Sequence, residues 1–236
     1  MKFEFPLQKG KWIKRYKRFM VDVALENGET LTVHSANTGS MKNCYVEGGD
    51  VWFWDSQNDK RKYPHSLELC ETPSGDIACI NTSRPNYLVV EAIKNGVVTE
   101  LQDYKTVRTE VRYGHEKSRI DILLEGGDKS IYVEVKNCTL MENNHQGFFP
   151  DAVSDRASKH LRELMLMVEQ GHRAAIFFCV NHTGIQLVQP ADHIDPKYGE
   201  LLREAANIGV EVLAYRAKIE ADSISLVESL PVLLSN

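Results

Sequence analysis

Three charged side chains, carried by two short apolar runs, have the types and spacing that can bind a metal ion. Asp121 lies in the first run, residues 119–124, and Glu134 and Lys136 lie in the second, residues 130–136. Because side chains alternate between the two faces of a strand, Glu134 and Lys136 share one face if this run is extended. The position of Asp121 relative to them depends on how the two runs pair.

The turn between the two runs determines whether the carboxylates meet. If the chain reverses symmetrically about residues 127–128, the hairpin places Asp121 directly opposite Glu134, and Arg119 opposite Lys136. Directly opposed side chains have Cβ atoms about 4.5–5.5 Å apart. A slip of one residue would put the two carboxylates on opposite faces. Two carboxylates this close repel each other unless a cation lies between them, so the register predicts a metal site.

The ligand types indicate which metal and which reaction. Carboxylates without histidine or cysteine favour hard cations, here Mg²⁺ or Mn²⁺, over Zn²⁺. Lys136 would lie beside a metal-bound water, where it could orient the water or offset charge on a phosphorus under attack. Asp121, Glu134 and Lys136 therefore form a candidate catalytic group for phosphodiester hydrolysis. The alternative is a solvated strand face, on which Glu-x-Lys is a common pattern.

Composition is typical of a globular protein and gives no general attraction to nucleic acid. The chain has 236 residues, 42% hydrophobic and 26% charged, with a net charge of −5. Its five cysteines are odd in number and lack Cys-x-x-Cys pairs, which favours a reducing cytoplasm over a disulfide framework. The N-terminal residues 1–12 resemble no signal peptide, and the longest apolar run, 174–180, is too short to cross a membrane.

The pattern of elements changes near residue 83. Before it, five short strand-like runs separated by turn residues predict a small antiparallel barrel, with an OB-fold as the leading candidate. These runs are 19–25, 30–34, 50–54, 66–71 and 77–80.

After residue 84 helices and strands alternate, which predicts an α/β (α+β) domain with a mixed central sheet. A long helix is expected to begin at a cap, Asp151 or Ser154, and to run through Gln170. The other expected elements are helix 87–94, strand 107–113, the hairpin, strand 173–180, helix 196–207 and strand 211–217.

The order of these elements, with an acid on the second strand and Glu-x-Lys on the third, resembles the core of the PD-(D/E)xK nuclease superfamily. Ile120 stands where a proline usually precedes the aspartate, which weakens the signature more than the site. Six segments spread over the chain are similar to the sugar fermentation stimulation protein A (SfsA) family of bacteria and archaea. They are RYKRF (15–19), NTGSM (37–41), KRKYP (60–64), SRID (118–121), FPDA (149–152) and HLREL (160–164).

The resemblance implies an OB-like DNA-binding domain over residues 1–83 and a nuclease-like α/β domain over residues 84–236 of a cytoplasmic protein. It leaves two functions open. One is a Mg²⁺- or Mn²⁺-dependent nuclease, and the other is a non-enzymatic DNA-binding protein, regulating sugar metabolism on an inactive nuclease scaffold. Oligosaccharide binding by the OB domain is a third reading. A homodimer is an option, because two strands need two cuts.

Members of the superfamily often add an acid from the first helix of the core. Glu91, on the helix expected at 87–94, fits that role by element order and is expected to complete the metal site. Glu110, on the strand before the hairpin, is a rival for the same role.

Two basic clusters are the candidate nucleic-acid surface, because cations neutralise phosphates and neighbouring aromatic rings can stack on bases. Trp12, Tyr16 and Phe19 are interleaved with the first cluster, although they could instead face the core. No recognition helix or zinc finger is visible, so binding is expected to be largely sequence-nonspecific. The candidate residues are Lys14, Arg15, Lys17, Arg18, Lys60, Arg61 and Lys62.

One face of the long helix offers a further candidate. Arg156, His160 and Glu163 lie on the side away from its apolar stripe. A solvated face is the default explanation. The functional alternative is that this face meets the scissile phosphate, with Arg156 as a phosphate contact and His160 nearby.

Overall fold

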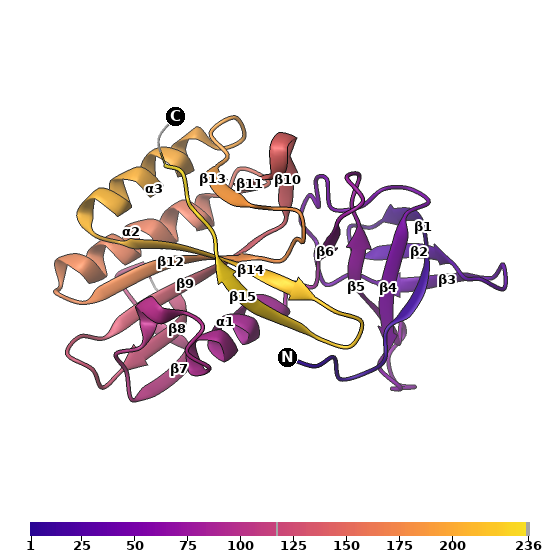
Figure 1. Cartoon of the computed structure of the whole chain (residues 1–236), viewed down its shortest axis with the longest axis horizontal. Coiled ribbons are helices and arrows are strands. Elements are labelled where there is room, and N and C mark those ends of the chain that lie inside the picture. The colour runs from indigo at the N-terminus through magenta and orange to yellow at the C-terminus, as the bar shows by residue number, and fades with distance from the viewer. Residues whose placement is uncertain (117, 235–236) are drawn as a thin grey trace.

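The computed structural model describes residues 1–116 and 118–234, which form an N-terminal β-barrel and a larger α/β part. In Figure 1 the barrel lies on the right, and the α/β part, with its twisted sheet and its helices, lies on the left. This confirms the expected fold class. Within the described ranges no helix is both long enough and apolar enough to cross a membrane.

The barrel is built from one sheet in the order β3-β2-β1-β4-β5-β6. A pairing between His34 of β3 and Ser66 of β5 closes it. Its strands are β1 (Gln8–Tyr16), β2 (Met20–Ala24), β3 (Thr30–His34), β4 (Asp50–Asp55), β5 (His65–Glu71) and β6 (Ile77–Cys79).

Strand β1 was not predicted from the sequence, because its lysines obscure the apolar alternation. Gly10 and Trp12 are buried, whereas Lys9 and Lys11 are exposed. Trp12 stacks on Tyr45 with ring centroids 3.9 Å apart. At least this aromatic ring of the basic segment therefore packs in the core and is not free to stack on a base.

The α/β part has a six-stranded mixed sheet in the order β15-β14-β12-β9-β8-β7. Strands β14, β12 and β9 are parallel, and the antiparallel strands β8 and β7 extend one edge and β15 the other. The strands are β7 (Thr106–Tyr113), β8 (Ser118–Glu125), β9 (Ile131–Cys138), β12 (Arg173–Val180), β14 (Glu211–Ile219) and β15 (Ile224–Ser229).

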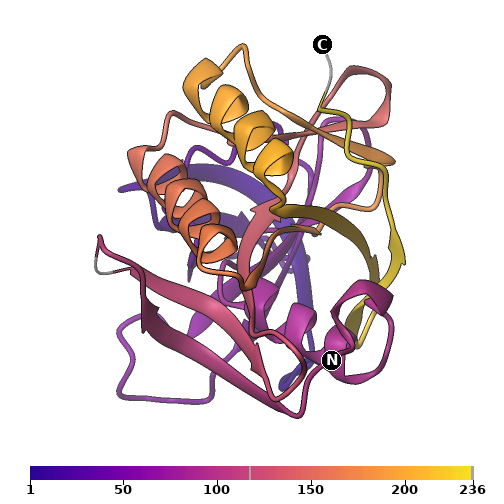
Figure 2. The ribbon, with the colours of Figure 1, turned by 90° about the vertical axis from the view of Figure 1, so that its left-hand side faces the viewer.

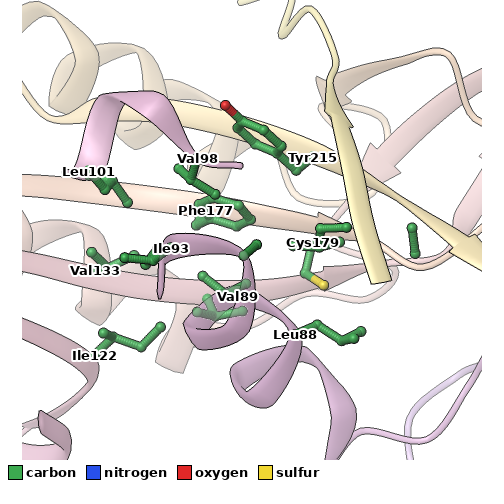
Figure 3. Packing of buried hydrophobic residues seen from close by; sticks show 14 of the residues in the cluster. Leu88, Val89, Ile93, Val98, Leu101, Ile122, Val133, Phe177, Cys179 and Tyr215 are labelled. Carbon is green, nitrogen blue, oxygen red and sulfur yellow. The ribbon is translucent and has the colours of Figure 1, made fainter. Parts of the chain in front are cut away.

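Helices cover both faces of this sheet. Helix α1 (Arg84–Lys94) packs on one face, where Leu88, Val89 and Ile93 meet Val133 and Phe177 of the sheet (Figure 3). Helices α2 (Asp155–Glu169) and α3 (Pro196–Ile208) lie side by side on the other face (Figure 2).

The longest helix begins at the second of its two predicted caps. The Ser154 hydroxyl accepts a hydrogen bond from the amide of Ala157, so Ser154 is the N-cap. Asp151 instead accepts a hydrogen bond from Ser40 of the barrel at 2.6 Å.

Short elements that the sequence patterns did not reveal complete the α/β part. A small sheet in the order β10-β11-β13 lies beside the main one. The remaining elements are β10 (Leu140–Glu142), β11 (Gln146–Phe149), β13 (Leu187–Pro190) and the 3₁₀ turns Thr99–Leu101 and Asn143–His145.

The buried carboxylate of Glu68 links the barrel to α1 through an ion pair with Arg84. Glu68 of β5 is fully buried and accepts hydrogen bonds from Trp54, Asn81 and Arg84. Arg84 is the first residue of α1 and binds Glu68 with two nitrogen atoms, at 2.5 and 3.0 Å. This interaction fixes the start of α1 relative to the barrel.

We expect Glu68→Ala to lower the free energy of unfolding by about 3 kcal/mol, because it leaves the half-buried Arg84 guanidinium without its counter-charge. Urea denaturation measures this loss. Glu47→Ala, at an exposed position of the barrel, is the control and should change stability by less than about 0.5 kcal/mol. Equal effects of the two substitutions would contradict this role of Glu68.

Candidate active site

The backbone pairing of strands β8 and β9 ends at Ile122 and Val133, and the Asp121 side chain makes the next contact between the two strands. The pairs Leu124–Ile131, Leu123–Tyr132 and Ile122–Val133 follow the predicted register. The next pair would be Asp121 with Glu134, but no backbone ladder continues there. Instead, Asp121 Oδ2 accepts a hydrogen bond from the amide of Val135 at 2.8 Å. A side chain thus replaces the neighbouring strand as the acceptor.

Helix α1 supplies the second partner of this carboxylate. The Asn86 side-chain amide donates to Asp121 Oδ1 at 3.0 Å. The pKa of Asp121 lies above its usual value, mainly because burial disfavours the charged form and also because Glu134 is close. The Val135 and Asn86 hydrogen bonds act in the opposite direction without outweighing these effects.

Glu134 is buried and only one of its two oxygens is satisfied. Oε1 lies 2.7 Å from Lys136 Nζ and in close contact with His160 Nδ1. Oε2 is buried without a hydrogen-bond partner among the described residues. Burial is the largest influence and raises the pKa of Glu134, but the interactions with His160 and Lys136 together outweigh it and hold the pKa below its usual value.

His160 reaches the site from α2, on the side of the sheet opposite α1. Because a carboxylate only accepts hydrogen bonds, the contact with Glu134 assigns a proton to His160 Nδ1. Lys136 Nζ lies 3.2 Å from the same nitrogen. The helix face carrying Arg156, His160 and Glu163 is therefore not a plain solvated face: His160 and Glu163 are buried, and Arg156 alone is exposed.

Glu163 and Tyr113 complete the surroundings. Both Glu163 oxygens accept backbone hydrogen bonds from the turn after β7, from His115 at 3.0 Å and from Glu116 at 2.6 Å. The buried Tyr113 hydroxyl has no partner among the described residues. Burial and then the charges of Glu134, Glu163 and Asp121 raise its pKa, so it remains a neutral donor.

The donor set fits a hard divalent cation. A buried and a half-buried carboxylate, Glu134 and Asp121, lie at adjacent positions of two strands. One oxygen of Glu134 lacks a partner among the described residues, and burial with repulsion by Glu134 disfavours the charge on Asp121. A cation bound by Asp121 and Glu134 would remove these unfavourable terms. In the described part of the chain no group of three or more His, Cys, Asp or Glu side chains is close enough to hold a metal.

Glu91, expected as a third ligand, lies elsewhere. Its carboxylate pairs with the amino group of Met1 at 2.7 Å, and that amino group also donates to Ile224 O of β15. Asn86, five residues earlier on α1, takes the position beside Asp121. The element order identified the correct helix, but five residues correspond to a rotation of about 140° around a helix with 3.6 residues per turn.

Glu110, the rival acid, falls opposite Asp121 in the register of β7 and β8. The ladder pairs Thr109 with Ile122 and Val111 with Ile120 but omits this position. Glu110 has a φ of 56°, which is strained for a residue within a strand, and its side chain is exposed. It lies near the site in register without forming a metal-binding group with Asp121 and Glu134.

Arg15, a predicted DNA contact, has a structural role in the barrel. Its guanidinium donates to the carbonyl oxygens of Arg18, Asn37, Gly39 and Ser40 at 2.6 to 3.4 Å. It therefore holds the turn after β1 against the loop that follows β3. These donors are not available to phosphate.

The other predicted barrel residues differ in how freely their charges are presented. Lys17 and Arg18 are exposed in the turn between β1 and β2, both with positive φ. Lys14 is exposed but lies 3.6 Å from Asp22. Of the loop between β4 and β5, Lys60 and Lys62 are exposed, whereas Arg61 is half-buried over the Trp54 ring.

Comparisons with known proteins agree with both halves of this architecture. The family "Sugar fermentation stimulation protein RE domain" matches residues 83–223, and "SfsA N-terminal OB domain" matches residues 13–80. A sugar fermentation stimulation protein homolog of Teredinibacter turnerae is 56% identical over 234 residues, covering 99% of this chain and 100% of the relative. One of Saccharophagus degradans is 53% identical over 232 residues, covering 98% and 100%.

A solved structure shares the fold over nearly the whole chain. The Pyrococcus furiosus SfsA structure, determined in complex with Ca²⁺, has a TM-score of 0.86 and 28% identity, covering 99% of this chain and 98% of that one. That relative was thus determined with a divalent cation bound.

The lowered pKa of Glu134 predicts how its replacement changes stability with pH. Since the folded pKa lies below the ordinary value of 4.5, ionised Glu134 stabilises the fold above that pH, and this stabilisation is lost as the pH falls through the folded pKa. Glu134→Gln should therefore lower stability at neutral pH, by about 3 kcal/mol when the buried network is broken. The loss should shrink in acid.

Chemical denaturation of the metal-free protein at several pH values measures this difference. Asp128→Asn, in the exposed turn of the same hairpin, is the control and should show little change at any pH. A deficit of Glu134→Gln that grows as the pH falls would mean that the sign of the pKa shift is wrong.

Proposed function

This chain belongs to the sugar fermentation stimulation protein family, and we propose that it is a DNA-binding nuclease that hydrolyses phosphodiester bonds with Mg²⁺ or Mn²⁺. The observation that carries the proposal is the pair of carboxylates formed by the half-buried Asp121 and the buried Glu134, with Lys136 held beside Glu134. Burying such charges is costly for the fold, so a functional reason for keeping them is expected.

The roles of the side chains follow from their surroundings. Asp121 and Glu134 would hold the cation, which when bound polarises a phosphoryl oxygen and lowers the pKa of a water. Lys136 is largely buried, and its ammonium lies between Glu134 and His160. From there it offsets negative charge that develops on a phosphate in the site. His160 orients Glu134 and so acts as a positioning residue.

The exposed cations of the barrel support DNA as the partner. Lys17, Arg18, Lys60 and Lys62 lie on two loops, and no hydrogen bond or ion pair joins these side chains to other described residues. Exposed cations contact phosphates without reading bases, so we propose binding that is largely independent of sequence. Arg156, exposed at the start of α2, is a further proposed phosphate contact.

Location and assembly are part of the same proposal. All five cysteines are buried and free, which is typical of a reducing compartment, so we assign the protein to the cytoplasm. A homodimer would allow two copies of the site to cut both strands of a duplex.

We expect Glu134→Gln and Asp121→Asn each to reduce metal-dependent cleavage by at least about 100-fold, because each removes a proposed ligand of the cation that polarises the phosphate and activates the water. The assay compares plasmid, linear, single-stranded and branched DNA with Mg²⁺ or Mn²⁺. Lys136→Met should show a similar loss.

Asp128→Asn is the control and should cleave as the wild type does. Cleavage that persists equally in Glu134→Gln would indicate another active site or a contaminant. If the wild type binds DNA and never cuts it, the protein is a non-enzymatic DNA-binding member of the family.

The barrel surface gives a separate prediction. We expect Lys17→Gln with Arg18→Gln, and Lys60→Gln with Lys62→Gln, to weaken DNA binding and to flatten its salt dependence. For every phosphate that these cations no longer neutralise, the slope of log affinity against log salt should become shallower by about 0.9. Fluorescence anisotropy at several salt concentrations measures both effects.

Two variants serve as comparisons. Lys218→Gln removes an exposed charge from β14 that pairs with Glu220, and it should leave the slope unchanged. Arg15→Gln should mainly lower the melting temperature, because it removes hydrogen bonds within the barrel. If the four loop substitutions leave the slope unchanged, the barrel is not the DNA-binding surface.

A further inference from the structure

Two arginines oppose each other directly on the hairpin that carries Asp121. Arg112 of β7 pairs in register with Arg119 of β8. Both are exposed, and neither side chain donates to or pairs with another described residue. Like charges directly opposite each other in an antiparallel pair destabilise the sheet. An anion bound between them would reverse that effect.

The two arginines also line one surface hollow, together with Tyr113 and Gly114. Tyr113 joins this hollow to the carboxylate site, because it lines the hollow while its buried hydroxyl is influenced by the charges of Glu134 and Asp121. The hydroxyl itself has no hydrogen-bond partner in the described part of the chain. Tyr113 therefore lies between the hollow and the two carboxylates.

Helix α2 positions the turn after β7 that borders this hollow. Gly114 has a φ of 70°, and a Cβ there would collide with the Glu163 carboxylate, so glycine allows the turn to approach the helix closely. Glu163 then accepts the amides of His115 and Glu116. The same helix carries His160, which contacts Glu134. One rigid element thus positions both the acids and the arginine pair.

Neighbouring charges do not neutralise the pair. Glu116, in the turn, is already bound by Arg162 at 3.1 Å and by the Lys159 ammonium through its carbonyl. Glu125 pairs with Arg108, which lies on the same strand as Arg112, and so does not pair with Arg112 or Arg119. Glu110 is exposed, and its left-handed backbone departs from the regular strand geometry.

We propose that Arg112 and Arg119 form a phosphate-binding subsite that grips the nucleic-acid backbone next to the scissile phosphodiester. Two directly opposed guanidinium groups match the oxygens of one phosphate, or of adjacent phosphates on one strand, with charge-assisted hydrogen bonds. This inference rests on the proposed nuclease function and extends it to a third contact region, distinct from the barrel loops.

The test compares the double variant Arg112→Gln/Arg119→Gln with Arg108→Gln, a control on the same strand whose charge pairs with Glu125 outside the hollow. The first measurement is the melting temperature with and without inorganic phosphate, at constant ionic strength. Phosphate should raise it for the wild type and for Arg108→Gln, and should have little effect on the double variant. Without phosphate the double variant should be at least as stable as the wild type, because the repulsion is gone.

The second measurement is binding of a labelled DNA duplex in EDTA, so that no strand is cut. For the double variant we expect an affinity about tenfold lower and a salt slope smaller by about 1.8, which corresponds to two phosphates at about 0.9 each. Arg108→Gln should retain the wild-type slope.

The outcomes separate this inference from the proposed function. If phosphate stabilises the wild type and the double variant equally, and their salt slopes agree, the subsite does not exist. If the phosphate effect depends on the arginines but the wild type binds no DNA, the anion site stands, and its assignment to nucleic acid is overturned together with the proposed function.

Discussion

The site depends on one hydrogen bond, in which the Asp121 carboxylate, and not a backbone carbonyl of β8, accepts from the amide of Val135. Where β8 and β9 would continue their ladder, Asp121 accepts the amide hydrogen of Val135, and the backbones separate. This satisfies a backbone donor that would otherwise be orphaned, and it fixes an acidic group beside Glu134 in a largely buried position. The rest of the site follows from the need to stabilise two carboxylates there.

The supporting contacts come from both faces of the sheet. Asn86 of α1 reaches Asp121 from one side, and His160 of α2 reaches Glu134 from the other. The Lys136 ammonium lies between Glu134 and His160, yet one oxygen of Glu134 remains without a partner among the described residues. Such incomplete satisfaction destabilises a fold and is characteristic of sites kept for function. The unpartnered oxygen of Glu134 also distinguishes the Asp121–Glu134 site from the structural ion pair of Glu68 with Arg84, in which both carboxylate oxygens are hydrogen-bonded.

The sequence was most informative where local patterns dominate. A symmetric turn about residues 127–128 predicted the hairpin register, which the pairs from Leu124–Ile131 to Ile122–Val133 follow, and strand β12 was predicted with its observed bounds. The contacts of Arg15 could not be predicted, because its acceptor carbonyls include those of a loop that folding alone brings close. The same holds for Asn86, whose importance depends on the rotation of α1. Strand β1 was not predicted, because its exposed lysines obscure the alternation of buried residues.

The central claim is that Asp121 and Glu134 bind a divalent cation as a pair. Titration calorimetry with Mg²⁺, Mn²⁺ and Ca²⁺ tests it directly, comparing the wild type with Asp121→Asn, Glu134→Gln and Glu91→Gln. The account predicts that the first two substitutions abolish binding and that Glu91→Gln retains it, because Glu91 lies away from the pair. Unchanged binding in Asp121→Asn and Glu134→Gln, or loss of binding in Glu91→Gln alone, would contradict the account.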